Sequence, residues 1–377
     1  MTDDDRPTRV SSPYFTKMDG SRELHVNFVS NHNGSYPSDI IFATLPAPLS
    51  VALTSVVLPF LLPTRYALLR YSSRIWIHLL IETMTVVCPI LLSFTVLSDS
   101  TSLNPIYLLL LITALMICAP KWWGPNIPVT DHLFSLTMPE KKPPFLTNYR
   151  AGMNLATAIC ILAVDFPVFP RRFAKTETYG YGLMDVGVGS FIIAHGLVGS
   201  SQNHSARTWS KTFPILLLGV LRLVAVKLSN YHEHVTEYGI HWNFFFTLAF
   251  VKIASDLLTT NVRPIVLSFG LLAVYELGLK LGLESWIISD FPRNNLISAN
   301  REGIFSLLGY MALFYAACEL GDYIKKPKTQ FKDWFRLLMA LVSLSVLGWT
   351  CLQISESLFG MQPSRRLANF SFCVWMV

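Results

Sequence analysis

The sequence predicts an all-α polytopic membrane protein with about ten transmembrane helices and a truncated eleventh. Two observations support this prediction. Of the 377 residues, 52% are hydrophobic and only 14% are charged, whereas soluble domains carry about 25% charged residues. The apolar residues also gather into runs of roughly 17 to 25 residues, the length that crosses a hydrocarbon core of about 30 Å. A mean hydropathy of +0.43 agrees with a chain that lies largely in a bilayer.

The predicted spans follow one another with short polar connections. The first contains Pro46, Pro48 and Pro59, whose freed carbonyls need neighbouring helices inside a membrane. An eleventh run, 367–377, is too short to cross. We expect a polar lumenal segment over 1–39 and a multi-span domain over 40–377. The ten spans lie near 40–62, 75–97, 104–120, 150–167, 183–200, 212–229, 242–259, 264–283, 303–321 and 337–359.

The distribution of lysine and arginine predicts the orientation of the chain. Connections after odd-numbered spans hold fifteen of these residues, and those after even-numbered spans hold seven. Because basic residues stay on the cytoplasmic side, the N-terminus and the even-numbered connections should face the lumen. The sequon at Asn33 would then be lumenal. The basic residues form no stripe, so the net charge of +6 does not indicate nucleic acid.

The six cysteines lie inside apolar runs without CxxC pairing, so we predict neither a metal site nor a disulfide framework. His232, His234 and His241 precede the seventh span, but their spacing matches no established zinc pattern. Histidines are instead acid and base candidates near neutral pH. Two charged residues inside predicted spans, Asp185 and Arg222, should face the interior of the bundle, because charge at mid-bilayer is costly.

The most informative stretch is 165–191, which begins where an apolar run ends. It places Asp165, Arg171, Arg172 and Lys175 within eleven residues, on the predicted lumenal side. One interpretation is that the basic side chains reach for lipid headgroups. The other is a site for a phosphate or a developing oxyanion, since arginine forks match phosphate oxygens and lysine supplies a compact charge.

At these residues the chain resembles the inositol acyltransferases of GPI-anchor biosynthesis, called PIG-W in animals. The resemblance extends from residue 28 to the last residue, and its family continues beyond that point. It therefore implies a C-terminally incomplete domain. The segments that carry it are 148–151, 165–191, 233–247, 298–303 and 364–369.

The resemblance implies an endoplasmic reticulum enzyme with a lumenal site. Such an enzyme moves a fatty acyl group from acyl-CoA, with palmitoyl-CoA expected, to the inositol 2-hydroxyl of glucosaminyl-phosphatidylinositol. It needs no bound cofactor. Direct transfer requires a base and positive charge beside the oxyanion. Asp165 and Lys175 fit these roles and match the family motif; His234 and His241 are alternative bases.

The remaining site residues are predicted to bind substrate. Arg171 and Arg172 suit the phosphate of the inositol lipid or of CoA. The others come from the resembling segments on the same face: Asp185, His234, His241, Trp242, Asn243, Asn300 and Arg301.

Three other interpretations stay open at this point. A covalent acyl-enzyme through Ser190 or a cysteine lacks an elbow motif or a paired base. A secondary transporter or lipid scramblase would use intramembrane charges as a pathway, and often shows internal repeats, which we do not find here. A non-catalytic scaffold subunit would tolerate replacement of Asp165.

Overall fold

A computed structural model describes residues 28, 32–61, 71–118, 144–199, 208–229, 235–258 and 262–377, and within these ranges the regular elements are helices. The elements are α2 (Pro37–Thr44), α3 (Pro46–Leu61), α4 (Tyr71–Glu82), η2 (Thr83–Val87), α5 (Cys88–Phe94), η3 (Ser98–Ser100), α6 (Leu103–Cys118), α9 (Pro144–Ala163), η4 (Arg171–Phe173), α10 (Leu183–Val198), α11 (Thr208–Leu228), α12 (Val235–Tyr238), α13 (Phe244–Leu257), α14 (Pro264–Gly278), η5 (Leu279–Leu283), α15 (Glu284–Ile288), α16 (Leu296–Ala299), α17 (Arg301–Lys325), α18 (Phe331–Phe359) and α19 (Phe370–Met376).

Helices overlap every one of the ten predicted spans. In the described ranges, five helical runs are long and apolar enough to cross a membrane by themselves, and two shorter apolar helices, α6 and α10, accompany them. The chain is therefore a multi-pass helical membrane protein, while the count of ten crossings stays a prediction. The five runs are Pro37–Leu58, Ser73–Phe94, Pro264–Ile288, Arg301–Lys325 and Phe331–Phe359.

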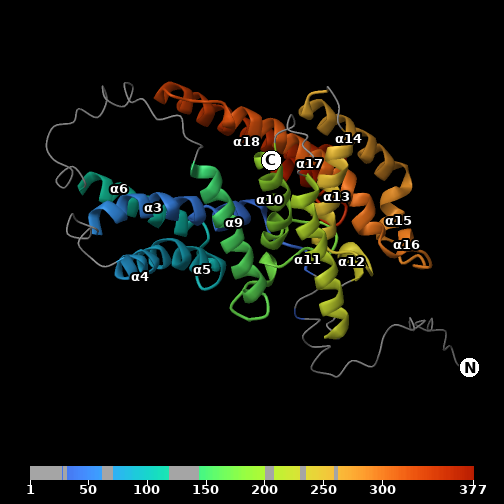
Figure 1. The fold of residues 1–377 in the computed structure, drawn as a ribbon, viewed down its shortest axis with the longest axis horizontal. Helices are drawn as coiled ribbons and strands as arrows, with labels where there is room; N and C mark the ends of the chain where they lie inside the picture. Colours follow the sequence, from blue (N-terminus) through green and yellow to red (C-terminus); the bar gives the residue numbers. More distant parts are fainter. Residues whose placement is uncertain are drawn as a thin grey trace, which may run out of the picture.

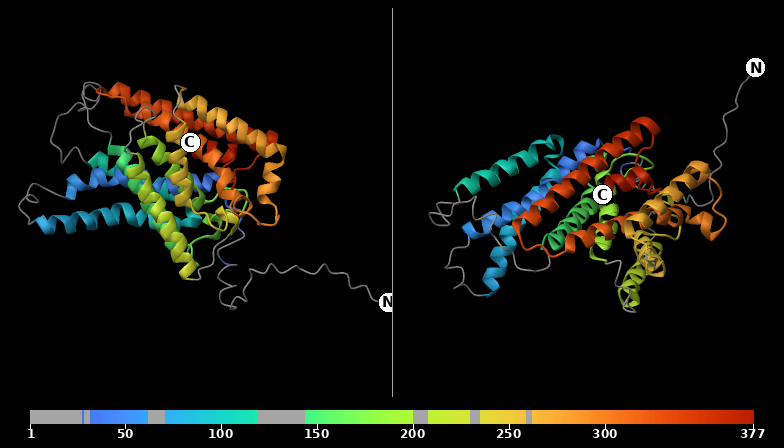
Figure 2. Two further views of the ribbon diagram at one scale, coloured as in Figure 1. Left: turned by 45° about the vertical axis from the view of Figure 1, so that its right-hand side comes forward. Right: turned by 90° about the horizontal axis from the view of Figure 1, so that it is seen from above.

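The helices form two groups (Figures 1 and 2), built around the two larger of the three hydrophobic clusters found in the described residues. In one group, α17 packs against α10, α13 and α14. In the other, α3 packs against α5, α6 and α9. The long helix α18 contributes to both cores, through Leu337 to the first and Leu352 to the second. α17 is central, because 61% of its apolar window is buried, against 11% for α18.

The outer faces of the helices are apolar, as lipid contact requires. On α6, Leu109 and Leu110 are more than half exposed, and on α18 so are Val346 and Leu347. Exposed apolar side chains that are scattered singly need no explanation, but continuous faces mark an interaction surface. Here the partner of that surface is the hydrocarbon of the bilayer.

The segment before α19 lies inside the bundle, not on its surface, and residues 363–369 are all buried. Tyr310 of α17 donates a hydrogen bond to the carbonyl of Arg365 at 2.8 Å, and Tyr275 of α14 donates to that of Leu367 at 2.6 Å. Ala368 adopts the left-handed region with φ +50°, which is uncommon for a residue other than glycine. The tightest contact is made by Gly309, where a Cβ would overlap the Ala368 carbonyl oxygen.

We expect Gly309→Ala to destabilise the protein by about 1–3 kcal/mol, because the added methyl group overpacks a position closed by backbone. The thermal unfolding midpoint of the purified protein in detergent measures the effect. Gly270→Ala is the matched control, since a Cβ on this other helical glycine meets nothing within 4 Å. Equal midpoints for the two variants would contradict the packing described for the 363–369 segment.

Candidate functional site

The connections after even-numbered spans meet at one end of the bundle, as the charge count predicts. The connection between α9 and α10 touches the others directly. Arg172 lies 3.1 Å from Asp99 before α6, and Lys175 lies 2.9 Å from Glu237 in α12. Ser364 Oγ donates to the carbonyl of Thr178 at 2.5 Å. Four parts of the sequence thus share one polar region.

The two arginines of the 165–191 stretch are used by the protein itself. Arg171 donates to the carbonyls of Val164 at 2.8 Å and Phe169 at 2.7 Å, which closes the C-terminal end of α9. Burial lowers the pKa of Arg171, and the nearby charge of Asp165 opposes that shift. Arg172 donates to the carbonyl of Ser98 at 2.7 Å besides its pair with Asp99. Either arginine would have to leave these acceptors to bind a phosphate, so that role stays a prediction.

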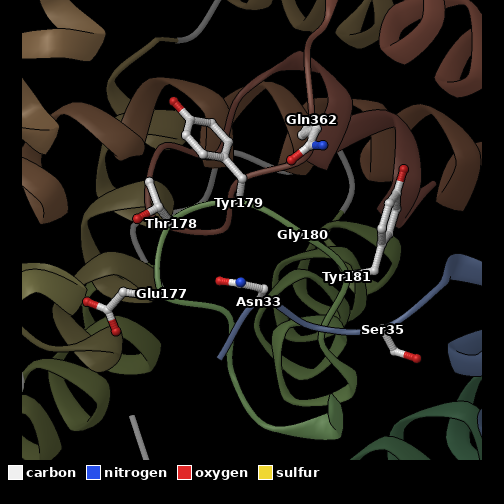
Figure 3. Close-up of a pocket in the computed structure, with 8 residues that line it drawn as sticks. All are labelled: Asn33, Ser35, Glu177, Thr178, Tyr179, Gly180, Tyr181 and Gln362. Carbon is white, nitrogen blue, oxygen red and sulfur yellow. The ribbon is translucent and has the colours of Figure 1, made fainter. Parts of the chain in front are cut away.

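A polar pocket of about 590 Å³ opens beside this connection. Such a volume lies within the roughly 300–1,000 Å³ typical of small-molecule sites. Figure 3 shows Glu177 and Thr178 at one end, Tyr181 and Ser35 at the other, and Asn33 between them. Three segments distant in sequence form it, namely 33–35, 177–181 and Gln362.

The pocket wall is held from both sides by backbone hydrogen bonds. The amide of Ser35 donates to Tyr181 at 2.7 Å, and the amide of Gly180 donates to Pro363 at 3.0 Å. Gly180 has φ +125°, a conformation suited to glycine, and it passes close to the Asn33 carbonyl. The 177–181 wall is therefore fixed by both the N-terminal and the C-terminal parts of the chain.

A group of charged side chains adjoins the 177–181 wall through Thr176; we call it the Asp185 cluster. Asp185 accepts from Arg365 at 2.7 Å, and both side chains are at least 96% buried. Asp185 also accepts from Thr176 Oγ1 at 2.7 Å. Arg365 lies 3.6 Å from Glu237, which pairs with Lys175 at 2.9 Å. The cluster thus contains two acidic and two basic side chains. Lys175 lies at its more exposed end, with 26% of its side chain exposed.

Within this cluster, electrostatics keep the Arg365 guanidinium charged. Burial is the largest influence on Arg365 and lowers its pKa, but Asp185 and Glu237 outweigh it, so the pKa is raised overall. Tyr238, whose ring lies 5.7 Å from the Arg365 guanidinium carbon, has its pKa raised to about 12 by burial. The tyrosine is therefore neutral near pH 7, while Arg365 is charged.

A second ionic group, the Glu302 cluster, lies at the start of α17. Glu302 is fully buried and accepts from Arg293 at 2.5 Å and from Arg366 at 2.9 Å. Arg301 also lies 3.8 Å from Glu302. It donates to the carbonyl of Ile287 in the last turn of α15 and to those of Ser289 and Phe291 after that helix. Carbonyls at a helix C-terminus favour cations, so they offset the excess positive charge. Consecutive residues Arg365 and Arg366 thus enter different clusters.

Several residues predicted to contact substrate form hydrogen bonds that stabilise the local structure of the site. Asn243 caps α13 by accepting from Phe245 and Phe246 amides, and it donates to the Gly219 carbonyl at 2.9 Å. Asn300 accepts from the His241 amide at 2.8 Å. Trp242 donates to Thr247 Oγ1 at 2.9 Å and stacks on Phe250. Contact of these residues with substrate stays a prediction.

The remaining predicted residues are scattered. Asp165 is exposed after α9. His241 Nδ1 lies 3.5 Å from Lys227 Nζ, whereas His234 lies outside the described residues. The expectation of two inward charges is confirmed for Asp185 and wrong for Arg222, whose side chain is exposed on α11. Long arginine side chains can reach the interface from a lipid-facing position, so a charge within an apolar run need not point inward.

Six charged residues of the two clusters and the pocket escaped selection as site residues. They lie in or beside stretches that attracted attention for other residues, and they are Glu177, Glu237, Arg293, Glu302, Arg365 and Arg366. Their signal was a carboxylate or guanidinium on the charge-poor side of the membrane, where basic residues are unexpected. Counting acids together with bases on that side would have found them.

An apolar helical bundle with a polar pocket and buried ion pairs at one end defines a multi-pass membrane protein with a one-sided polar site. The GWT1 family model matches residues 21–377. The chain is 32% identical to the bovine glucosaminyl-phosphatidylinositol-acyltransferase PIGW, over 94% of this chain and 74% of that protein. It is 36% identical to the Aspergillus fumigatus GPI-anchored wall transfer protein 1, over 93% of this chain and 77% of that protein.

A relative from Dictyostelium discoideum, the phosphatidylinositol-glycan biosynthesis class W protein, is 32% identical over 92% of this chain and 79% of its own length. Similarity of this extent covers the pocket and both ionic clusters, which begin at Asn33 and end at Arg366. The chain belongs to the GWT1 family.

Proposed function

We propose that the chain is a membrane acyltransferase of GPI-anchor biosynthesis. It moves a fatty acyl group, palmitoyl in the simplest case, from acyl-CoA to the inositol 2-hydroxyl of glucosaminyl-phosphatidylinositol. The observation that carries this proposal is the family match over 21–377, with a relative named for that acyl transfer at 32% identity. The charge count supports a site on the lumenal face of the endoplasmic reticulum membrane.

In the proposed reaction the inositol 2-hydroxyl oxygen attacks the carbonyl carbon of the thioester. Asp165 accepts the hydroxyl proton, and the Lys175 ammonium stabilises the oxyanion. Collapse of the intermediate breaks the carbon–sulfur bond and releases CoA thiolate, which takes up a proton. Lys175 has three N–H donors, and its contact with Glu237 leaves donors for the oxyanion.

The location of Lys175 supports this assignment. It lies two residues before Glu177, which lines the pocket, and its ion pair is only about three-quarters buried. A cation two residues from the wall of a polar pocket, held by a buried network, is arranged to meet developing negative charge without reorganisation. Asp165 begins the same connection and is open to solvent, so a substrate hydroxyl can approach it.

The proposed function is tested by measuring the mass of the acceptor lipid after reaction. Purified protein in nanodiscs receives isotope-labelled palmitoyl-CoA and glucosaminyl-phosphatidylinositol. We expect a new lipid heavier by one labelled acyl group. A transporter or scramblase would move the lipid across the bilayer at unchanged mass, and a scaffold subunit would do neither. Either of those results would reject the proposal.

We expect Asp165→Asn to reduce the rate of acyl transfer by about 10²- to 10⁴-fold, the usual contribution of a general base. Steady-state rates in the same nanodisc assay measure it. Asp99→Asn is the matched control, because Asp99 is also an exposed acid at this end of the bundle and removal of its surface pair costs little. If His241→Ala lost activity while Asp165→Asn stayed active, the general base would be His241 and not Asp165.

A further inference from the structure

We infer that the carboxylate of Glu177 binds the free ammonium group of the amino sugar in the acceptor headgroup, so that the pocket selects an amino sugar over its N-acetylated form. This inference rests on the proposed function and concerns the same pocket. Among the described residues that line the pocket, Glu177 is the one charged side chain.

The pocket offers hydrogen-bonding groups suited to a polyol. Tyr179 and Tyr181 donate their hydroxyls to Glu284 and Glu356, which fixes both rings. Ser35 donates to Asp39 at 2.6 Å. The amides of Asn33 and Gln362 and the hydroxyl of Thr178 form no side-chain hydrogen bond within the described part of the chain, so they stand ready for a ligand.

Glu177 lacks a cationic partner among the described residues. Its carboxylate accepts from the Thr236 hydroxyl at 3.0 Å, a neutral contact that leaves most of its lone pairs unused. The nearest basic residue in sequence, Lys175, is paired with Glu237 at 2.9 Å. In the part of the chain that the structure describes, this half-buried pocket carboxylate therefore has no counter-ion, and an ammonium group is the ligand that supplies one.

The position of Glu177 suits catalysis as well as selection. Lys175 and Glu177 are two residues apart, and their partners, Glu237 and Thr236, are adjacent. In an extended segment, residues two apart point the same way at a separation of about 7 Å. An amino sugar anchored on Glu177 would thus set its neighbouring inositol ring beside Lys175.

N-acetylation would oppose binding in two ways. It removes the positive charge that pairs with Glu177, and it adds an acetyl group to the end of the pocket where Thr178 and Glu177 meet. A hydrogen bond to a charged group is worth about 10- to 100-fold in affinity. The pocket should therefore discriminate between the two sugars by about that factor.

The test compares wild type with Glu177→Gln and Thr236→Val. The glutamine keeps an oxygen for the Thr236 hydroxyl but removes the charge, whereas the valine removes the hydroxyl and keeps the charge. In acyl transfer to glucosaminyl-phosphatidylinositol, Glu177→Gln should raise KM by about 10- to 100-fold with little change in kcat. The Glu177→Gln variant should lose the preference for the free-amine lipid over the N-acetylated lipid. The Thr236→Val variant should retain that preference.

A second readout does not require acyl transfer. Saturation-transfer NMR with water-soluble glucosaminyl-inositol, and with its N-acetylated form, measures binding to the full chain in detergent. Preferential binding of the free amine by wild type, lost in Glu177→Gln, supports the inference even if no acyl transfer is found. Acyl transfer by wild type with KM and preference unchanged in Glu177→Gln overturns the inference alone. Absence of both binding and transfer in wild type overturns both proposals.

Discussion

Lys175→Ala should lower the rate of acyl transfer by about 10²- to 10³-fold, the usual cost of removing one group that stabilises an oxyanion. The side chain is 26% exposed and its pair with Glu237 is partly solvated, so its removal should cost little stability. Steady-state kcat in nanodiscs measures the effect, with size-exclusion chromatography to show that the variant folds.

The chain contains a close control for this experiment. Lys252 pairs with Asp256 at 2.8 Å, with side-chain exposures of 22% and 21%, against 26% and 25% for Lys175 and Glu237. Lys252→Ala therefore removes an ion pair of nearly the same length and burial. Lys252 lies about two turns from the start of α13, away from the site. The substitution should leave kcat unchanged. Similar losses in both variants would show that Lys175 acts only through the fold.

Arg365→Ala should destabilise the protein by about 3–5 kcal/mol, since it leaves Asp185 buried and without its cation. The thermal unfolding midpoint in detergent reports this loss. Arg336→Ala is the surface comparison, because its pair with Asp333 is 63% and 35% exposed; pairs of that kind contribute about 0–1 kcal/mol.

A double variant separates the ion pair from simple packing. Asp185→Asn with Arg365→Met replaces both charges by neutral groups of similar size, and such replacements of buried pairs are often close to neutral. We expect its unfolding midpoint to lie well above that of Arg365→Ala. A double variant no more stable than the single one would show that Arg365 matters through its contacts with Tyr238 and the backbone instead.

The sequence predicted those features that depend on local composition. Apolar run length located the helices, since a span is a property of consecutive residues. The asymmetry of lysine and arginine predicted that alternate connections share one face, and the contact of Lys175 with Glu237 confirms that they meet. The resemblance directed attention to 165–191, which provides the pocket wall at 177–181 and supplies Asp185 and Lys175 to the adjoining cluster.

Pairs between residues distant in the sequence could not be predicted from local composition. Arg365 reaches Asp185 across 180 residues of sequence, and composition does not say which of many carboxylates an arginine will find. The pocket likewise needs Asn33, Glu177 and Gln362 to come together from separate segments. Arg171 illustrates the same limit: its charge suggested a phosphate site, and composition did not predict that it donates to the Val164 and Phe169 carbonyls in the connection after α9.

Photo-crosslinking can locate the binding site of the acceptor lipid on the protein. A glucosaminyl-phosphatidylinositol analogue with a diazirine on the inositol ring is photolysed with the wild-type protein, and labelled peptides are identified by mass spectrometry. We expect label within 175–181 or 33–35, and we expect excess unlabelled lipid to suppress it. Competable label confined to other elements, such as α11 or α18, with none in 175–181, would contradict this expectation.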